Sequence, residues 1–397
     1  MSIISRRGLL TSGIALGFGA YAWHRGIRYP RLSLEPEALE YHRKTKHGFF
    51  VYKDLIALAS EEASFRAFAP EPKLWLKTNG QPLTIKVHNI SKKATLKVQA
   101  NTTIQIDEHV DGIDRELHIK ETEDEFTLYW QMPKNEPIRF AVIGDTGANS
   151  ELNACLNRAL ELDADYLLHL GDFNYIEGEY SKAIKAFNNA PMPCFVSIGN
   201  HDFHDNGLIY QRFREELGPM NNVFTINGVR FINLDTAADF LPAHSGNRAD
   251  LLHSLVESSR QSQPQQQIVF THRPLKDPRP HDDHQITGLN EVAWLTKVLK
   301  AAGGGYFLNG HVHHSAEFDV EGIRQYTVGE GLGHEDIVLQ KKVAKLLVAD
   351  ISAESEVQLN WQALNIPWQA HRSETHEAKL KYDGRLRQLE WYKNLLT

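Results

Sequence analysis

The sequence predicts an α/β fold with a layered α-β-β-α domain, preceded by a small β-sandwich-like domain. From residue 138 onward, apolar runs of strand length alternate with helical patterns and then give way to further strands, which is the order of a layered α/β architecture. Between residues 74 and 130, short period-two runs are separated by Asn-Gly and Asp-Gly turns, a pattern typical of a small β-sandwich.

The β-rich part carries alternating apolar positions and no cluster of reactive side chains. We expect it to be a structural or docking module. Its alternating runs are Leu83/Ile85/Val87, Leu96/Val98, Ile104/Ile106, Leu117/Ile119 and Phe126/Leu128/Trp130.

The α/β part reads as a regular succession of elements. We predict strands over Ile138–Gly144, Tyr166–Gly171, Cys194–Gly199, Ile268–Thr271, Tyr306–Asn309, Ile323–Val328, Leu346–Ile351 and Val357–Trp361. Helices are expected over Glu151–Leu162, Tyr180–Asn188, Leu251–Ser259 and Glu291–Leu299, with a hairpin turn at Asn227-Gly228.

Two pairs of prolines, Pro70 with Pro72 and Pro133 with Pro137, mark the boundaries of the β-rich segment in the 397-residue chain. We expect a signal peptide over 1–22, a polar connector over 23–69 with a short helix from Leu55 to Phe68, the β-sandwich-like domain over 70–136, the layered α/β domain over 137–366, and an amphipathic C-terminal helix over 367–397.

The N-terminal segment has the three parts of an export signal. Ser5-Arg6-Arg7-Gly8 supplies a basic start, an uncharged stretch runs from Leu9 to Ala22, and Ala20-Tyr21-Ala22 fits a cleavage site. The paired arginines resemble a bacterial twin-arginine signal, although Leu9 and Thr11 replace the preferred Phe and Lys. We therefore expect a periplasmic protein exported by the twin-arginine machinery, with membrane attachment only if the signal is not cleaved.

The composition indicates which kinds of ligand the protein can bind. The formal net charge of −7 argues against a nucleic-acid binder, whereas 20 histidines make a metal site worth seeking. Cys155 and Cys194 each fall in an apolar pattern, so two buried thiols are expected rather than a disulfide.

Five strands of the α/β domain end in side chains that can bind a metal. Each motif follows an apolar run, so the donors are expected at one edge of the sheet structure, and the glycines let the chain turn there. The motifs are Gly144-Asp145-Thr146-Gly147, Gly171-Asp172-Phe173-Asn174-Tyr175, Gly199-Asn200-His201-Asp202, Val269-Phe270-Thr271-His272 and Gly310-His311-Val312-His313.

This set resembles the calcineurin-like metallophosphoesterases and, among them, the purple acid phosphatases. The general family usually has Asp-x-His in the first motif, where this chain has Asp145-x-Gly147. The general family also usually lacks a tyrosine at the position that Tyr175 takes in the second motif. The purple acid phosphatase forms GDxG, GDxxY, GNH(D/E), VxxH and GHxH are all present. The resemblance covers roughly residues 138 to 330 and makes the α/β part a metallophosphoesterase domain.

The resemblance implies a binuclear centre. Asp145, Tyr175 and His313 would bind the first metal, and Asp172 would bridge both ions. Asn200, His272 and His311 would complete the second site. Oxygen donors in the first site suit Fe(III), and nitrogen donors in the second suit Fe(II), Zn(II) or Mn(II). With Tyr175 as a phenolate on iron, the protein would be coloured; core packing of Tyr175 is the alternative.

The same resemblance gives His201 a role at the phosphoryl group or leaving oxygen, against the alternative of a hydrogen-bonded structural histidine. Asp202 is expected to orient a histidine from outside the ligand set. Arg273 is open between phosphate binding and a solvent-facing position. The run His281-Asp282-Asp283-His284 is expected to be a solvated rim rather than a third metal site.

These observations predict an exported metal-dependent phosphatase that hydrolyses small phosphate monoesters by metal-activated hydroxide attack. One alternative is a phosphodiesterase or nucleotide hydrolase on the same fold. Another is a non-catalytic exported scaffold, in which the β-domain and C-terminal helix act.

Overall fold

The computed structural model describes residues 40–367, apart from 59–62, 123, 135, 177, 204–208, 238–245, 263, 265, 280–283, 287–288 and 334–342. The expected signal peptide and C-terminal helix lie outside the described residues. No helix within the described residues is long and apolar enough to cross a membrane.

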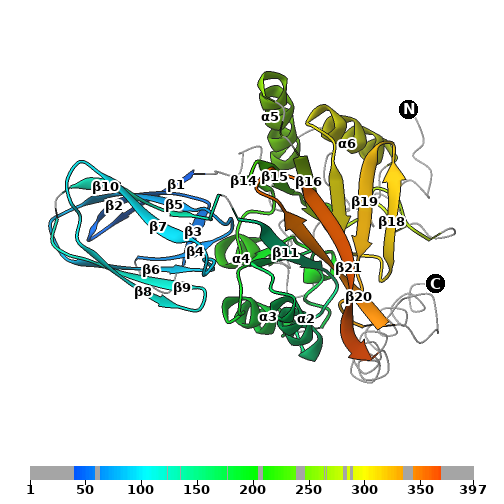
Figure 1. Ribbon diagram of the computed structural model, residues 1–397, viewed down its shortest axis with the longest axis horizontal. Helices are drawn as coiled ribbons and strands as arrows, with labels where there is room; N and C mark the ends of the chain where they lie inside the picture. The colour runs from blue at the N-terminus through cyan, green and yellow to red at the C-terminus, as the bar shows by residue number, and fades with distance from the viewer. Residues whose placement is uncertain are drawn as a thin grey trace, which may run out of the picture.

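The N-terminal part of the described chain is built from two five-stranded sheets, drawn in blue and cyan in Figure 1. The first sheet has the order β1-β2-β5-β10-β7, with strands Glu40–Thr45, Gly48–Lys53, Lys73–Thr78, Glu125–Gln131 and Thr95–Ala100. The second has the order β3-β4-β6-β9-β8, with strands Leu55–Ala57, Ser64–Ala67, Leu83–His88, Asp114–Ile119 and Ile106–Asp111.

The first residues of these sheets differ from our prediction. Residues 40–67, expected in a connector, contribute four strands, and the helix expected from Leu55 to Phe68 is wrong because β3 and β4 occupy this segment. β4 pairs in parallel with β6, and its side chains are fully buried. Burial on both faces removes the need for the period-two alternation that marks a half-exposed strand, so the pattern of this segment did not indicate strands.

The α/β part contains two further sheets. One has the order β13-β12-β11-β20-β21, with strands Cys194–Val196, Tyr166–His169, Ile138–Ile143, Val343–Ile351 and Val357–Pro367. The other has the order β14-β15-β16-β17-β19-β18, with strands Asn222–Ile226, Val229–Asn233, Gln266–Thr271, Tyr306–Asn309, Ile323–Val328 and Ser315–Val320.

Helices cover the outer faces of these two sheets, as the layered fold requires (Figure 1). α2 (Ser150–Glu161) and α3 (Glu179–Asn188) accompany the first sheet, and α5 (Asn247–Gln261) and α6 (Leu289–Ala301) accompany the second. The short α4 (Ile209–Glu216) lies near β3, and a 3-10 turn, η1, spans His201–Phe203.

Side chains that alternate between the two faces of each strand account for the packing of sheet on sheet and of helix on sheet. On β16, Ile268 and Phe270 point into the core between the sheets, whereas Val269 joins the cluster under α5 and α6. Between the sheets, the ring of Phe231 packs edge-on against Phe140 at 5.4 Å, while Phe140 stacks on Tyr166 at 5.3 Å. The layered α-β-β-α prediction is thereby confirmed.

A buried arginine joins the two parts of the chain. Arg66, on β4, is 1% exposed and donates to Asn188 Oδ1 at 3.1 Å, Leu217 O at 3.1 Å and Cys194 O at 3.2 Å. The carboxamide of Asn89 both donates to Cys194 O at 3.1 Å and accepts the Cys194 N–H at 2.9 Å. The open edge of β13 is therefore capped by side chains from the N-terminal sheets, which limits the exposure of unpaired strand groups.

The two cysteines are buried free thiols, as predicted. Burial raises the pKa of the Cys194 thiol to about 12, which keeps it protonated and unreactive.

Candidate metal centre

The carboxyl ends of the parallel strands place the candidate ligands together. β11, β12 and β13 run parallel in one sheet, and β16 and β17 run parallel in the other. The donors stand in the loops that follow these five strands, at facing edges of the two sheets. The backbone turns sharply there, with positive φ angles of 60° at Asp145, 58° at Asp172 and 67° at His311.

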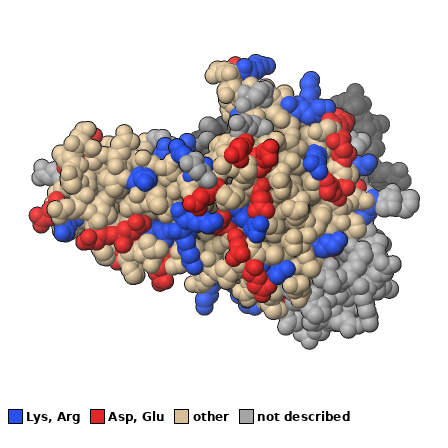
Figure 2. All heavy atoms as spheres, in the orientation of Figure 1, with Lys and Arg blue, Asp and Glu red and all other residues tan. Residues whose placement is uncertain are grey.

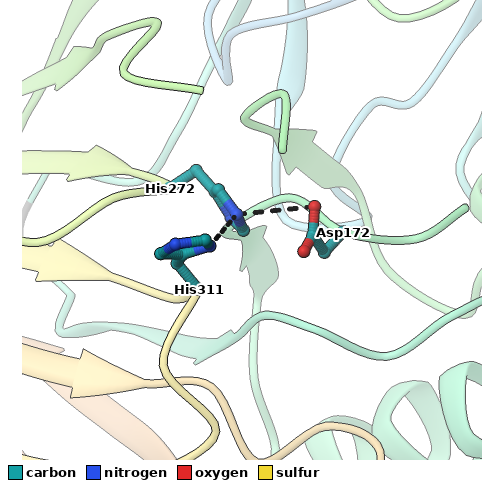
Figure 3. A group of neighbouring side chains, drawn as sticks. All are labelled: Asp172, His272 and His311. Carbon is teal, nitrogen blue, oxygen red and sulfur yellow. Dashed lines mark hydrogen bonds and ion pairs between the residues drawn. The ribbon is translucent and has the colours of Figure 1, made fainter. Parts of the chain in front are cut away.

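One group of donors surrounds His272 (Figure 3). Its Nε2 lies 2.8 Å from Asn200 Oδ1, 3.1 Å from His311 Nδ1 and 3.4 Å from Asp172 Oδ1. The ring is fixed on its other side by Nδ1, which lies 2.8 Å from the carbonyl oxygen of Leu170.

This arrangement fits a cation. When Nδ1 of neutral His272 donates to Leu170, Nε2 carries a lone pair. That lone pair faces the electron pairs of Asn200, Asp172 and His311 across the distances given above. Such convergence needs a positive charge among the donors. Burial would lower the pKa of His272, but the carboxylates of Asp172 and Asp145 outweigh burial and raise that pKa to about 9, so a proton supplies the charge in the absence of metal. A metal ion would replace that proton, and mixed oxygen and imidazole ligands suit Zn, Mn or ferrous iron.

A second group gathers around Tyr175. Its hydroxyl oxygen lies 3.2 Å from His313 Nε2 and 3.5 Å from Asp145 Oδ1, and His313 Nε2 lies 3.6 Å from the same carboxylate oxygen. The structure therefore brings Asp145, Tyr175 and His313 together, as expected for one site with hard oxygen donors.

Charges within the centre shift the pKa values of the acids in opposite directions. Burial would raise the pKa of Asp172, but the nearby charges of His272 and His201 outweigh burial and hold that pKa far below its usual range. For Asp145, burial dominates over the opposing influence of His313, so the pKa is raised.

Three glycines pack closely against the carboxylates of Asp145 and Asp172. A Cβ at Gly199 would stand 2.2 Å from Asp172 Oδ1, and one at Gly310 would stand 2.3 Å from Asp145 Oδ2. A Cβ at Gly329 would lie 3.0 Å from the same Asp145 oxygen. Only glycine leaves room for the carboxylates at these three positions.

His201 lies beside the donors rather than among them. Its backbone N–H donates to Asp172 Oδ1 at 2.8 Å, while its Nε2 is 4.0 Å from Asp172 Oδ2. The ring packs at 4.6 Å from the ring of Tyr175, and the side chain is 25% exposed. It can thus contact a molecule bound at the centre.

Asp202 does not orient a histidine, and that prediction is wrong. Its carboxylate accepts backbone N–H groups from Gly199 at 2.6 Å, Phe173 at 2.9 Å and Asp172 at 3.0 Å. These bonds link the loop after β13 to the loop after β12. The carboxylate therefore fixes both loops by satisfying buried donors.

Arg273 is buried rather than solvent-facing, at 8% exposure. Burial lowers the pKa values of His201 and His311, and the positive charge of Arg273 lowers both further. A guanidinium close to both histidines is suited to a phosphate group. In the expected rim, residues 281–283 lie outside the described residues, but the His284 ring lies 5.5 Å from the His311 ring.

Two supporting residues were missed in the sequence. Glu179 accepts the N–H groups of Tyr175 at 2.7 Å and Ile176 at 3.1 Å, which fixes the turn that carries the tyrosine. His169 is fully buried and lies 2.9 Å from Thr146 Oγ1, while its Nδ1 accepts the Gly171 N–H at 3.2 Å. A polar residue ending an apolar strand was the only available signal for His169.

Known proteins provide an independent comparison. Residues 138–315 match the family model described as Calcineurin-like phosphoesterase. A curated relative from Arabidopsis thaliana, described as probable purple acid phosphatase 20, is 24% identical over 227 residues, which cover 50% of this chain and 52% of the relative. The match thus spans about half the length of that relative.

Solved structures also show similarity. GAP50, described as the anchor in the inner membrane complex of Plasmodium, is 15% identical, with 59% of this chain and 86% of that chain covered and a TM-score of 0.41. A structure of PhoD is 10% identical, with 74% and 87% covered and a TM-score of 0.41.

Proposed function

Because this chain carries a calcineurin-like phosphoesterase domain, with strand-end motifs of the purple acid phosphatase type, we propose that it is a metal-dependent phosphatase acting on small phosphate monoesters. The proposal rests chiefly on the convergence of Asp172, His272 and His311, whose donor atoms all lie within 4.8 Å of one another. A buried set of converging carboxylate and imidazole donors is the arrangement that a metal ion needs.

The seven predicted ligands divide between two metal ions in this proposal. Asp145, Tyr175 and His313 would hold the first, Asn200, His272 and His311 would hold the second, and Asp172 would be shared by both. Together the ions would supply a hydroxide nucleophile and neutralise charge on the phosphoryl group.

The protein's own groups bind and orient the ester. Arg273 attracts the phosphate oxygens, and its burial strengthens this attraction by excluding water. His201, partly exposed beside Asp172, can donate a hydrogen bond to the phosphoryl group or a proton to the leaving oxygen. Asp202 and Glu179 keep the ligand-bearing loops in place through the backbone bonds described above.

A direct comparison of substrates tests the reaction class. We expect 4-nitrophenyl phosphate to be hydrolysed with a higher kcat/KM than bis(4-nitrophenyl) phosphate. The diester has one negative charge where the monoester has two near neutral pH, so the cationic centre favours the monoester. A preference for the diester would overturn the monoester assignment while leaving the phosphoesterase domain in place.

The visible absorption spectrum of the protein as purified tests the first metal. Tyrosinate bound to Fe(III) gives a broad visible band, so we expect a coloured protein and loss of that band in Tyr175→Phe. Metal analysis of both proteins provides the control. A colourless protein with a full metal complement would exclude an iron–tyrosinate site.

The variant His201→Ala distinguishes an enzyme from a non-catalytic scaffold. Since His201 lies beside the ligands, we expect metal content to persist and turnover to fall by about 10²-fold. A wild-type protein that binds metal but hydrolyses neither ester would favour the non-catalytic scaffold.

Export through the twin-arginine route is part of the proposal and depends on Arg6 and Arg7. Replacing both arginines by lysines should retain the protein in the cytoplasmic fraction. Unchanged periplasmic recovery would argue against this route.

A further inference from the structure

The outer face of the first N-terminal sheet carries an unusual combination of side chains. Strand alternation places five lysines there, and Glu125 is the acidic residue among them whose side chain the structure describes. The lysines are Lys44, Lys53, Lys73, Lys77 and Lys97, and all five are exposed. This positive face stands on a chain whose formal net charge is −7. We call it the lysine–aromatic face.

One cross-strand row concentrates the charge. Lys53 on β2 lies directly opposite Lys73 on β5, which lies opposite Tyr129 on β10, which in turn lies opposite Lys97 on β7. Like charges directly opposite each other destabilise a sheet. With strands about 4.8 Å apart, the row extends over roughly 14 Å.

Ion pairs do not neutralise this row. Within the described part of the chain, Lys77 pairs with Glu125 at 2.6 Å, whereas Lys53, Lys73 and Lys97 form no ion pair. Asp54 and Glu71 lie close enough to Lys73 to be influenced by its charge, but neither forms an ion pair with it in this part of the chain.

Aromatic rings lie between the lysines. Phe49, 37% exposed, stacks on His42 at 5.9 Å and meets Trp75 edge-on at 6.1 Å. Trp75 and Tyr129 are partly exposed, and Lys73 Nζ lies 5.9 Å from the Tyr129 ring centre. Rings and cations therefore alternate across an open, five-stranded surface.

The opposite sheet has a different surface. Its outer face carries Asp107, Asp111, Asp114 and Glu116, with Lys86 and the buried Arg66 as the only Lys or Arg on that face in the described strands, and no Phe, Trp or Tyr. Figure 2 shows acidic side chains along the side of this domain where β8 and β9 lie. The positive charge and rings are thus specific to one face.

We propose that the lysine–aromatic face binds an acidic polysaccharide. Aromatic side chains pack against the apolar faces of sugar rings, and the lysines between them meet carboxylate or phosphate groups spaced along the polymer. Single-stranded nucleic acid, whose bases also stack on aromatic rings, is the competing occupant, and the experiment below separates the two. This binding site is separate from the proposed phosphatase centre.

Native affinity electrophoresis of the full chain tests the proposal. Gels would contain carboxymethyl cellulose, or hydroxyethyl cellulose as an uncharged polymer with the same glucan backbone. We expect retardation by the charged polymer alone. Trp75→Ala and the double variant Lys73→Glu/Lys97→Glu should each weaken binding at least about fivefold.

Lys92→Glu provides a matched control, because Lys92 is exposed in the same domain but lies in the loop between β6 and β7. It should bind like the wild type, and circular dichroism should show that all variants fold. The proposal fails if carboxymethyl cellulose does not retard the wild type, if the face variants bind normally, or if single-stranded poly(dT) binds more tightly than the polysaccharide. Phosphatase activity should be unchanged in every face variant.

Discussion

Substituting Gly199 by alanine should disrupt the metal centre although Gly199 itself is not a proposed ligand. Gly199 has a φ that any residue can adopt, so the substitution introduces no backbone strain of the left-handed kind. Its new Cβ would lie 2.2 Å from both the backbone nitrogen and Oδ1 of Asp172. Real Cβ contacts are essentially never shorter than 3.0 Å, so these atoms must separate by 0.8 Å, the difference between the two distances.

That displacement is large for a metal ligand. Metal–ligand distances tolerate about 0.2 Å, so a shift four times larger at Asp172 should cost the centre at least one ion. A misplacement of about 1 Å in an active site lowers the rate about 10²-fold. Overpacking should also lower the free energy of unfolding by about 1–3 kcal/mol.

Metal analysis, steady-state hydrolysis of 4-nitrophenyl phosphate and urea unfolding measure the three effects. Gly112→Ala is the control, because Gly112 has a φ of 60° but no neighbouring atom within 4 Å of the position that a Cβ would take, so the substitution adds strain without a clash. It should lower stability slightly and leave metal and activity unchanged. Two bound metals and wild-type kcat/KM in Gly199→Ala would refute the assigned position of Asp172.

Three further predictions follow from buried groups. Burial lowers the pKa of His169 to about 3, from a value of about 6.5 in the unfolded chain. The neutral buried imidazole therefore contributes to the stability of the folded state above pH 6.5, and this contribution is lost as the pH falls toward 3. Urea unfolding should show a loss of about 2 kcal/mol between pH 7 and 5, and His169→Gln should not show it. Arg66→Met should lower the unfolding free energy by about 2–4 kcal/mol, because buried carbonyl acceptors lose their donor, and a loss below 0.5 kcal/mol would contradict this. Glu179→Ala should reduce turnover by about tenfold and Glu179→Gln by much less, since the amide oxygen can still accept the Tyr175 N–H; equal effects would show that the acceptor does not position Tyr175.

The sequence supported the α/β elements well because their signals are local. The strands Tyr306–Asn309 and Ile323–Val328 have the predicted bounds, and the turn at Asn227-Gly228 joins β14 to β15. The segment from Leu55 to Phe68 failed for the opposite reason. Its strands are specified by partners elsewhere in the chain, β6 among them, rather than by their own pattern.

What the sequence by itself determined was which donors end each strand and hence the class of centre they can form. The tertiary structure decided what surrounds those donors. It turned Asp202 onto backbone N–H groups, packed Gly329 against Asp145, buried Arg273, and made Arg66 a link between the two parts of the chain. These contacts join residues far apart in the chain, and local patterns do not encode which distant groups will meet.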